Sequence, residues 1–511
     1  MLSSHFGNKK VMSGSAFNDK SEYRRTIKNL GIFGGAQGIS LFLSMVRNKV
    51  ASVLLGAAGL GFMALYNRAI QMFCDFTNLS LSFSAVRKLA EAYENESEET
   101  LLKYIRIVRS MAFLTGVAGM LLFFLLSPFI SNWVFDDQEY YMRRFFMLSP
   151  VVLFMAVSGG ELAVLRGVRE LNKVAAYSLW TAVSSVVISV PLFYFRGLGG
   201  IFPSIFLVAF AQMAGALYLS AGRYRYQISP FSLNLLRQGI DIVKLGAGYI
   251  YSSILTSFSA WFLCNFLADV SSDKLTGYFS AALVLITMLP TMLFAALDSD
   301  YYPRLSGIFG RKEERNAMVN GQIEVHLLVQ PPLILCFVVL LPQLLPLFYS
   351  EEFLPALQMI QIAMLGMLFH VVAYPISFMP LSKGDSLTFI VQETIYNTAF
   401  VLLVVYGYSC FGLMGLGMAM FVLRVLDFAV VCLIAGVRYG FMFSQRVIMS
   451  FLFEILLFAT VFCSVLLSGN SMVSWSVGIC AVSISAIASL YMLSHHNDLF
   501  NKIFKRLLRR R

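Results

Sequence analysis

The chain has 511 residues, of which 58% are hydrophobic and 13% charged, and its mean hydropathy is +0.73. Soluble domains are nearer half apolar and about a quarter charged, so this composition excludes a water-soluble enzyme, a disordered chain and a disulfide scaffold. A hydrocarbon core about 30 Å thick needs roughly 20 residues for each helical span. The composition therefore predicts an all-α polytopic membrane protein. The net charge of +11 is expected from basic loops beside anionic membrane lipids, and we expect no nucleic-acid partner.

Apolar runs bounded by charged or turn residues predict fourteen transmembrane helices. In chain order they cover 29–47, 59–84, 106–127, 146–165, 174–194, 198–219, 245–267, 275–297, 325–348, 356–379, 387–407, 411–436, 447–468 and 472–494. The hydrophilic segments between these runs are too short to form a domain. The sequence therefore predicts a membrane bundle without a sizeable soluble part.

The positive-inside rule supports an even number of spans. Of the 39 Lys and Arg residues, 31 fall in the tails and the predicted cytoplasmic loops, and six fall in predicted outer loops. Arg47 and Lys49 are among these outer six. Omitting one span would invert every later loop and destroy this asymmetry, so the charge distribution predicts that both termini are cytoplasmic.

Two segments six spans apart resemble each other. Gly61 and Phe62 lie in the second span, which leads to Arg87, whereas Gly277 and Tyr278 open the eighth span, which leads to Arg304. Repeats of this kind are common in transporters. We therefore predict a basic cytoplasmic tail (1–28), a six-span N-lobe (29–222), a cytoplasmic linker (223–244), a six-span C-lobe (245–437), two further spans (438–495) and a basic cytoplasmic tail (496–511).

Polar residues of the second span lie on one face of the helix. At 100° per residue they cover an arc of about 100°, and they are Asn67, Arg68, Gln71, Asp75 and Asn78. The first span carries a similar stripe, made of Gln37, Ser40, Ser44, Arg47 and Asn48. Facing stripes on neighbouring helices predict a wet cavity. Alternatively, Arg68 and Asp75 are two turns apart and form one structural ion pair.

The second half of the chain has fewer charges inside its spans. A charge at mid-membrane costs about 2.5–3.5 kcal/mol on insertion scales, which makes Glu393, Arg424 and Asp427 candidate functional residues. Arg424 and Asp427 are also i,i+3 neighbours, so mutual neutralisation is an equal alternative.

Other polar residues lie near span ends or between helices. Glu161 and Glu454 are close to span ends, where we expect them at the membrane interface. We expect the hydroxyl residues of the seventh span to pack helices: Ser252, Thr256 and Ser259.

Catalytic motifs do not emerge from the sequence, which contains neither a GxxxxGKS/T phosphate loop nor an HExxH string. The histidines are scattered, and only the last two are adjacent: His5, His326, His370, His495 and His496. We therefore expect no enzyme, no resident cofactor and no metal site.

Several short strings occur in a recognisable order. They are Gly34-Gly35-Ala36-Gln37, Arg47-Asn48-Lys49-Val50-Ala51, Gly56-Ala57-Ala58-Gly59-Leu60-Gly61 and Val86-Arg87-Lys88-Leu89-Ala90-Glu91, followed after the eighth span by Asp300-Tyr301-Tyr302-Pro303-Arg304-Leu305-Ser306. With these strings, the segment from Gly31 to Glu91 resembles the Wzx-type flippases of lipid-linked oligosaccharides. This is the polysaccharide branch of the MOP (multidrug/oligosaccharidyl-lipid/polysaccharide) exporter superfamily, and the span count extends the similarity over nearly the whole chain.

The resemblance implies two six-helix lobes around a central cavity that opens alternately to each side of the bacterial cytoplasmic (inner) membrane. The implied substrate is a polyprenyl-diphosphate-linked oligosaccharide for O-antigen or capsule assembly, with a polysaccharide polymerase as a candidate partner. Because a diphosphate is anionic, we predict that it and its sugar contact Arg68, Arg47, Lys49, Gln37, Asn67, Gln71 and Arg424. Proton or sodium coupling is a candidate role for Asp75, Glu393 and Asp427.

Three other functions remain open from the sequence. A MATE-like drug or cation antiporter has the same architecture, but a cation carrier should have an acidic cavity, and Arg68 argues against it. A lipid II flippase shares the anion chemistry. A membrane polysaccharide polymerase or ligase is expected to have long outer loops, whereas the longest outer loop predicted here covers only about 128–145.

Overall fold

The computed structural model describes residues 20–78, 85–86, 88–90, 92–93, 97–134, 138–222, 224–229, 247–270, 273–297, 301–468 and 472–496. Every regular element in these ranges is a helix. Of the predicted basic tails, residues 1–19 and 497–511 lie outside the described residues, as do most of the predicted linker 223–244 and the side chain of Gln37. Residues 20–28, predicted as tail, are the first residues of α1.

The helices of the first half are α1 (Lys20–Asn78), α3 (Glu98–Val134), α4 (Gln138–Gly167), α5 (Leu171–Arg196), the short 3-10 helix η1 (Gly197–Gly200) and α6 (Ile201–Ala221). The second half consists of α8 (Ala247–Val270), α9 (Asp273–Leu297), α10 (Tyr301–Ile308), α11 (Lys312–Phe348), η2 (Glu351–Ala356), α12 (Leu357–Leu365), α13 (Met367–Lys383) and α14 (Ser386–Tyr439). Two helices end the described chain, α15 (Gln445–Ser468) and α16 (Met472–His496).

Two helices are too long for one membrane crossing, and each contains a glycine with a left-handed backbone. α1 has 59 residues with φ of 71° at Gly56, and α14 has 54 residues with φ of 57° at Gly412. A side chain other than hydrogen is strained at such φ values, whereas glycine adopts them readily. Each helix therefore forms two limbs, joined where the glycine permits the chain to turn.

The described helices accommodate the fourteen predicted spans. Nine are long and apolar enough to cross a membrane, and three of these nine hold two limbs each: α1, α14, and α5 joined through η1 to α6. The segment of η2, α12 and α13 forms another span with a 43° bend, and α9 contributes a shorter apolar helix. The prediction of an all-helical polytopic protein is confirmed.

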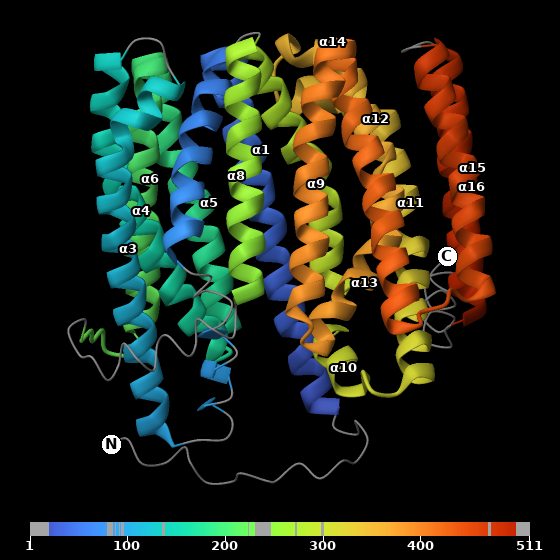
Figure 1. The fold of residues 1–511 in the computed structure, drawn as a ribbon, viewed down its shortest axis with the longest axis horizontal. Helices are drawn as coiled ribbons and strands as arrows, with labels where there is room; N and C mark the ends of the chain where they lie inside the picture. The colour runs from blue at the N-terminus through green and yellow to red at the C-terminus, as the bar shows by residue number, and fades with distance from the viewer. Residues whose placement is uncertain are drawn as a thin grey trace, which may run out of the picture.

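The helices stand side by side in two groups, with α15 and α16 at one edge of the bundle (Figure 1). In the first group α3 packs on α4, and α4 and α5 both pack on α6. In the second group α14 packs on α8, α12 and α13. Helix α1 contacts α5 of the first group and also α8 and α9 of the second, so it joins the groups.

The two similar glycine segments lie against each other where α1 meets α9. Gly277 at the start of α9 lies against the backbone of Ala57 and Gly61 in α1, and a Cβ at this position would overlap the Ala57 carbonyl oxygen. Small residues let membrane helices approach closely in this way. The repeat that the sequence indicates is therefore also a contact between the two halves.

The bundle has two ends, named here by their glycines. At the Gly56 end, Gly56 approaches Glu352 of η2, and Gly59 approaches Leu198 of η1. At the Gly440 end, the α13–α14 turn, the start of α11 and the end of α14 come together. The positive-inside rule predicts that the Gly440 end faces the cytoplasm.

Candidate functional site

The polar stripe of α1 reaches the other half of the molecule through Asp75. Its Oδ1 accepts a hydrogen bond from Gln71 Nε2 at 3.0 Å, and its Oδ2 accepts one from the hydroxyl of Ser257 in α8. Gln71 and Asp75 are i,i+4 neighbours, as the predicted stripe requires. The structure thus places this stripe against α8 and gives Asp75 two neutral donors.

Arg68 does not pair with Asp75. Its guanidinium interacts with the buried thiol of Cys264 in α8, and an Arg68–Asp75 ion pair is absent from the described part of the chain. Asn67, next along the helix, is exposed. The alternative in which Arg68 and Asp75 neutralise each other is therefore not realised in this structure.

Arg47 and Lys49 correct the predicted end of the first span. The prediction places both in an outer loop, but α1 remains helical until its turn at Gly56. Arg47 Nη2 lies 3.6 Å from the sulfur of Met63, and Lys49 Nζ donates to the carbonyl oxygens of Pro346 and Tyr349 at the end of α11. A helix C-terminus attracts a cation, which accounts for the position of Lys49, whereas the Nε of Arg47 is buried without a hydrogen-bond partner. Both residues therefore belong to the helix and do not mark its end.

A second polar cluster lies between α13 and α14. Arg424 Nη1 is 3.2 Å from His370 Nδ1, and the Arg424 guanidinium lies 5.5 Å from the centre of the Tyr396 ring. The same His370 nitrogen is 3.9 Å from Asp427 Oδ2. Among the described ion pairs, the partner of Asp427 is His370 and not Arg424. The i,i+3 neutralisation of Arg424 by Asp427 is thus replaced by two contacts with one histidine.

The hydroxyl residues of α8 also contact α14. Ser252 donates to Glu393 Oε2 at 2.8 Å, and Asn397 Nδ2 donates to Thr256 Oγ1 at 3.3 Å. The sequence predicts general helix packing for Ser252 and Thr256, whereas the structure gives them specific polar partners. Because Ser257 binds Asp75, α8 makes side-chain hydrogen bonds to both α1 and the first limb of α14.

His370 and its neighbour His326 are the residues that sequence reasoning missed. His326 is completely buried in α11, between the side-chain amides of Gln322 at 3.2 Å and Gln330 at 3.3 Å. Its ring stacks on Tyr374, with centroids 6.3 Å apart. Helical spacing could have found the partners of His326, because Gln322 and Gln330 are its i−4 and i+4 neighbours in α11. The partners of His370 lie on α14, and only the packing of α13 on α14 reveals them.

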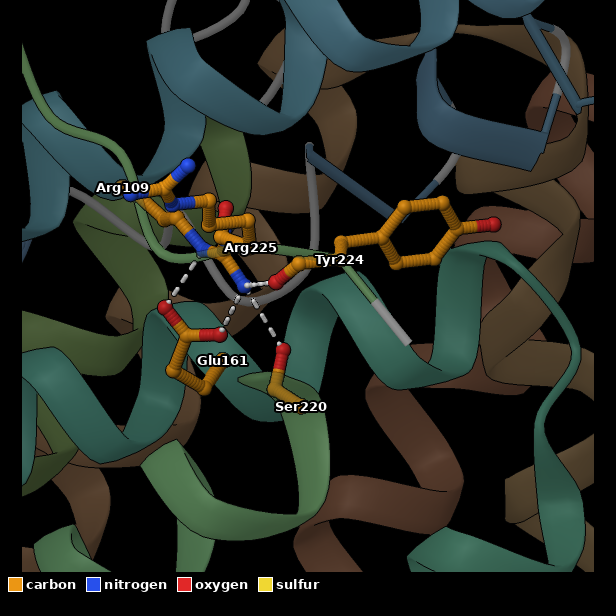
Figure 2. A network of polar contacts seen from close by, with 5 residues as sticks. All are labelled: Arg109, Glu161, Ser220, Tyr224 and Arg225. Atoms are coloured by element: carbon orange, nitrogen blue, oxygen red, sulfur yellow. Dashed lines mark hydrogen bonds and ion pairs between the residues drawn. The ribbon is translucent and has the colours of Figure 1, made fainter. Parts of the chain in front are cut away.

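Glu161, six residues before the end of α4, is buried among its neighbouring helices. Figure 2 shows the Arg109 guanidinium facing the Glu161 carboxylate, with two hydrogen bonds of 2.8 and 2.9 Å. Arg109 also donates to Ser220 Oγ at 2.9 Å and to the carbonyl oxygens of Tyr224 and Arg225 at 3.3 and 2.9 Å. This network joins α3, α4, α6 and the segment after α6, and all charge in it is compensated. A two-pronged pair of this kind stabilises one fixed arrangement.

Glu454 is also buried between helices. It is 3% exposed, and both of its oxygens accept from Ser485 of α16 at 2.9 and 3.1 Å. This contact joins α15 to α16 at the edge of the bundle, away from the two polar clusters.

The Gly56 end is held together by Glu352. Its Oε2 accepts from the backbone N–H of Ala57 at 2.8 Å, its Oε1 lies 3.1 Å from Lys274 Nζ, and its carbonyl accepts from the Tyr278 hydroxyl at 2.9 Å. The N–H of Ala57 opens the second limb of α1, where a carboxylate is favoured. Together with Lys49, Glu352 closes this end of the interface between the halves.

The architecture consists of two helical groups joined by α1 and α8, with polar clusters on α1 and α14. The sequence model of the family described as polysaccharide biosynthesis protein matches residues 26–309, which is more than half of the chain. The chain belongs to this family. The matched residues include α1, α8 and Asp75, whereas His370, Arg424 and Asp427 lie beyond them.

Solved structures support the same fold. The chain is similar to a lipid II flippase, MurJ, in an inward closed conformation, with 15% identity, 90% of this chain and 99% of that chain covered, and a TM-score of 0.69. A MATE multidrug resistance transporter in an inward-facing conformation has 14% identity, coverage of 80% and 94%, and a TM-score of 0.59. A MOP-superfamily transporter from Pyrococcus furiosus has 15% identity, coverage of 84% and 94%, and a TM-score of 0.54. A search of curated proteins gave no match.

Proposed function

We propose that this protein moves a polyprenyl-diphosphate-linked oligosaccharide from the cytoplasmic to the outer leaflet of a bacterial cytoplasmic membrane, for surface polysaccharide assembly. The two halves open alternately to each side, and the sugar and diphosphate pass between them while the lipid tail stays in the bilayer. The protein acts as a carrier and not as an enzyme. Membership in the polysaccharide biosynthesis family supports this substrate class.

The observation that carries the proposal is the set of partners of three arginines. Arg47 contacts a thioether, Arg68 a thiol, and Arg424 an imidazole and a phenol ring. A guanidinium group inside a membrane protein is costly unless it meets water or an anion, and its planar donors suit phosphate oxygens. Cationic groups with neutral partners are what a carrier of a diphosphate needs.

The same observation separates this proposal from the alternatives. A MATE transporter named for multidrug resistance is the second comparison, but a cation carrier would be hindered by these three guanidinium groups. A lipid II flippase is the first comparison and uses the same anion chemistry. The choice between the two lipid-linked glycans therefore depends on a direct test with both substrates.

The experiment uses proteoliposomes that contain the purified chain and a fluorescent polyprenyl-diphosphate glycan in both leaflets. A membrane-impermeant enzyme that cleaves the glycan consumes only the outer-leaflet fraction unless the protein exchanges the leaflets. We expect near-complete cleavage with protein and about half without it. Cleavage limited to the outer leaflet in both samples would contradict the proposal. Exchange of lipid II without exchange of the polysaccharide precursor would identify lipid II as the substrate instead.

Orientation is part of the proposal and has its own test. The charge distribution predicts that both termini face the cytoplasm. Reporter fusions at residue 470 should be active outside, and fusions at residue 511 should be active inside. Termini on opposite faces would contradict the fourteen-span arrangement.

A further inference from the structure

His370 stands between a cation and an anion of α14. Its Nδ1 lies 3.2 Å from Arg424 Nη1 and 3.9 Å from Asp427 Oδ2. An unprotonated imidazole nitrogen accepts a hydrogen bond, and a protonated one donates. Arg424 only donates, and an ionised Asp427 only accepts. The contact with Arg424 therefore needs an unprotonated Nδ1, whereas the approach to Asp427 is an ion pair only when the ring is protonated.

We propose that His370 is a proton-binding site that controls whether the Arg424 guanidinium binds the diphosphate of the substrate. Neutral His370 accepts from Arg424 and holds it. A proton added to Nδ1 removes this acceptor, repels the guanidinium and shifts the hydrogen bond of the ring to Asp427. Arg424 then turns to the anion. This inference rests on the proposed function, because it assigns a regulator to the same binding site.

Other charged and titratable groups surround the cluster. Those facing it are His326 from α11, Tyr374 from α13, and Glu393 and Tyr396 from the first limb of α14. Tyr301 of α10 donates its hydroxyl to the Pro375 carbonyl of α13. Helix α12 has no ionisable side chain. Lys274 of α9 binds Glu352 at the Gly56 end. In α15, Arg446 lies in the first turn, and Glu454 binds Ser485.

The charges nearest to His370 act in opposite directions. Asp427 favours its protonation, and Arg424 opposes it. An anion bound to Arg424 cancels the opposing charge, so anion binding favours proton binding. By thermodynamic linkage, each ligand increases the affinity for the other by the same factor. We therefore expect the substrate to bind together with a proton and to leave with one.

The test is titration calorimetry of farnesyl diphosphate binding to the purified full-length chain near pH 6. Repeating the titration in two buffers of different ionisation enthalpy gives the number of protons taken up per ligand. The comparison variant is His370→Gln, whose amide oxygen accepts from Arg424 but does not titrate. We expect the wild type to take up more protons per bound ligand than this variant, because only the imidazole binds a proton. The difference cancels the titration of the probe's own phosphate, which is common to both proteins.

Two further variants make the result decisive. His326→Gln replaces the other buried histidine of this region and should keep the proton uptake of the wild type. Asp427→Asn removes the negative charge that stabilises protonated His370 and should reduce proton uptake at the same pH. This variant preserves the test if His370→Gln does not fold. Equal proton uptake by the wild type, His370→Gln and Asp427→Asn would overturn the inference while leaving diphosphate binding intact. A wild type that binds no farnesyl diphosphate at any pH would overturn the proposed function together with it.

Discussion

Arg109 and Arg424 both place a guanidinium group within the helical bundle, but their surroundings differ in charge. Arg109 is 2% exposed and meets the Glu161 carboxylate, a serine hydroxyl and two backbone carbonyls (Figure 2). Arg424 meets an imidazole and the face of a tyrosine ring. Each donor of the first arginine has a fixed acceptor, whereas the charge of the second is uncompensated by its direct contacts. Arg109 is therefore suited to hold a structure, and Arg424 to bind a mobile anion.

The largest effect expected from this comparison is on folding. Arg109→Ala leaves Glu161 buried without its counter-charge, which should cost about 3–5 kcal/mol and reduce the amount of folded protein. Thermal unfolding followed by fluorescence-detected gel filtration measures the loss.

A control for Arg109 is the exposed pair Arg311–Glu314, whose side chains are 68% and 55% exposed. Arg311→Ala should change stability by less than about 0.5 kcal/mol. The double variant Arg109→Leu/Glu161→Leu should recover part of the loss, because it removes both charges. Normal stability of Arg109→Ala would mean that the network in Figure 2 does not hold the N-terminal helices.

Arg68 should show the opposite behaviour. Arg68→Ala should reduce transport about 10- to 100-fold, the range expected for hydrogen bonds to a charged group, while the protein still folds. Asp75 keeps its bonds from Gln71 and Ser257 in this variant. Arg68→Lys should retain part of the activity, since the charge remains but the two-pronged geometry is lost.

The double variant Arg68→Ala/Asp75→Ala separates the two roles of Arg68. Transport is measured in proteoliposomes and normalised to folded protein. We expect the double variant to transport no better than Arg68→Ala. Full transport by the double variant would show that Arg68 is not an anion ligand.

Gly277 tests an interlobe contact that involves no charge. In Gly277→Ala the new Cβ meets the Ala57 carbonyl oxygen, and relieving the overlap should cost about 1–3 kcal/mol. The halves should then separate more often at the Gly56 end, and single cysteines placed there should react faster with a maleimide. Gly321→Ala is the matched control, because a Cβ at Gly321 meets nothing within 4 Å. Equal labelling of the two variants would argue against closure of this end by Gly277.

The smallest effect is expected from a compensated pair near the surface. Asp385 caps α14, accepting from Thr388 N, and its Oδ2 lies 2.8 Å from Arg438 Nε. Burial acts to raise the pKa of Asp385, but hydrogen bonds from Thr388, Tyr439 and Arg438 outweigh burial and hold the pKa below its usual value. A carboxyl group of this kind stabilises the fold above its unfolded pKa and loses this contribution as the pH falls through the folded pKa.

Asp385→Asn measures that contribution, since asparagine keeps the helix cap but loses the ion pair with Arg438. Because Arg438 is 51% exposed, we expect a loss of only about 0.5–1 kcal/mol near pH 7. The difference from the wild type should shrink as the pH is lowered through the acidic range. A difference that is independent of pH would contradict the ionised state of Asp385.

The sequence predicts the helices well and their partners poorly. The eighth span is predicted at 275–297 and observed as Asp273–Leu297, since apolar runs determine such a helix locally. The first span is predicted to end at residue 47, yet α1 turns only at Gly56. Lys49 shows why: its positive charge resembles a span end, but the carbonyls that bind it belong to α11, about 300 residues away.

In the candidate site, too, the sequence predicts what lies within one helix but not the contacts between helices. The polar arc with Gln71 and Asp75 follows from helical periodicity and is present. The partner of Arg424 does not follow from periodicity, because the i,i+3 rule predicts Asp427, whereas packing brings His370 of α13 between them. Helix-to-helix contacts of this kind depend on how the bundle assembles, which one sequence without its tertiary contacts does not specify.

The most direct test compares two arginines of the same helix. Arg424→Ala removes a guanidinium with neutral partners, and Arg438→Ala removes one that is paired with Asp385. The measurement is the rate of polyprenyl-diphosphate glycan exchange in proteoliposomes, per folded protein. Arg424→Ala should lose at least about tenfold, whereas Arg438→Ala should transport like the wild type. Equal rates for the two variants would contradict the assignment of Arg424 to the anion.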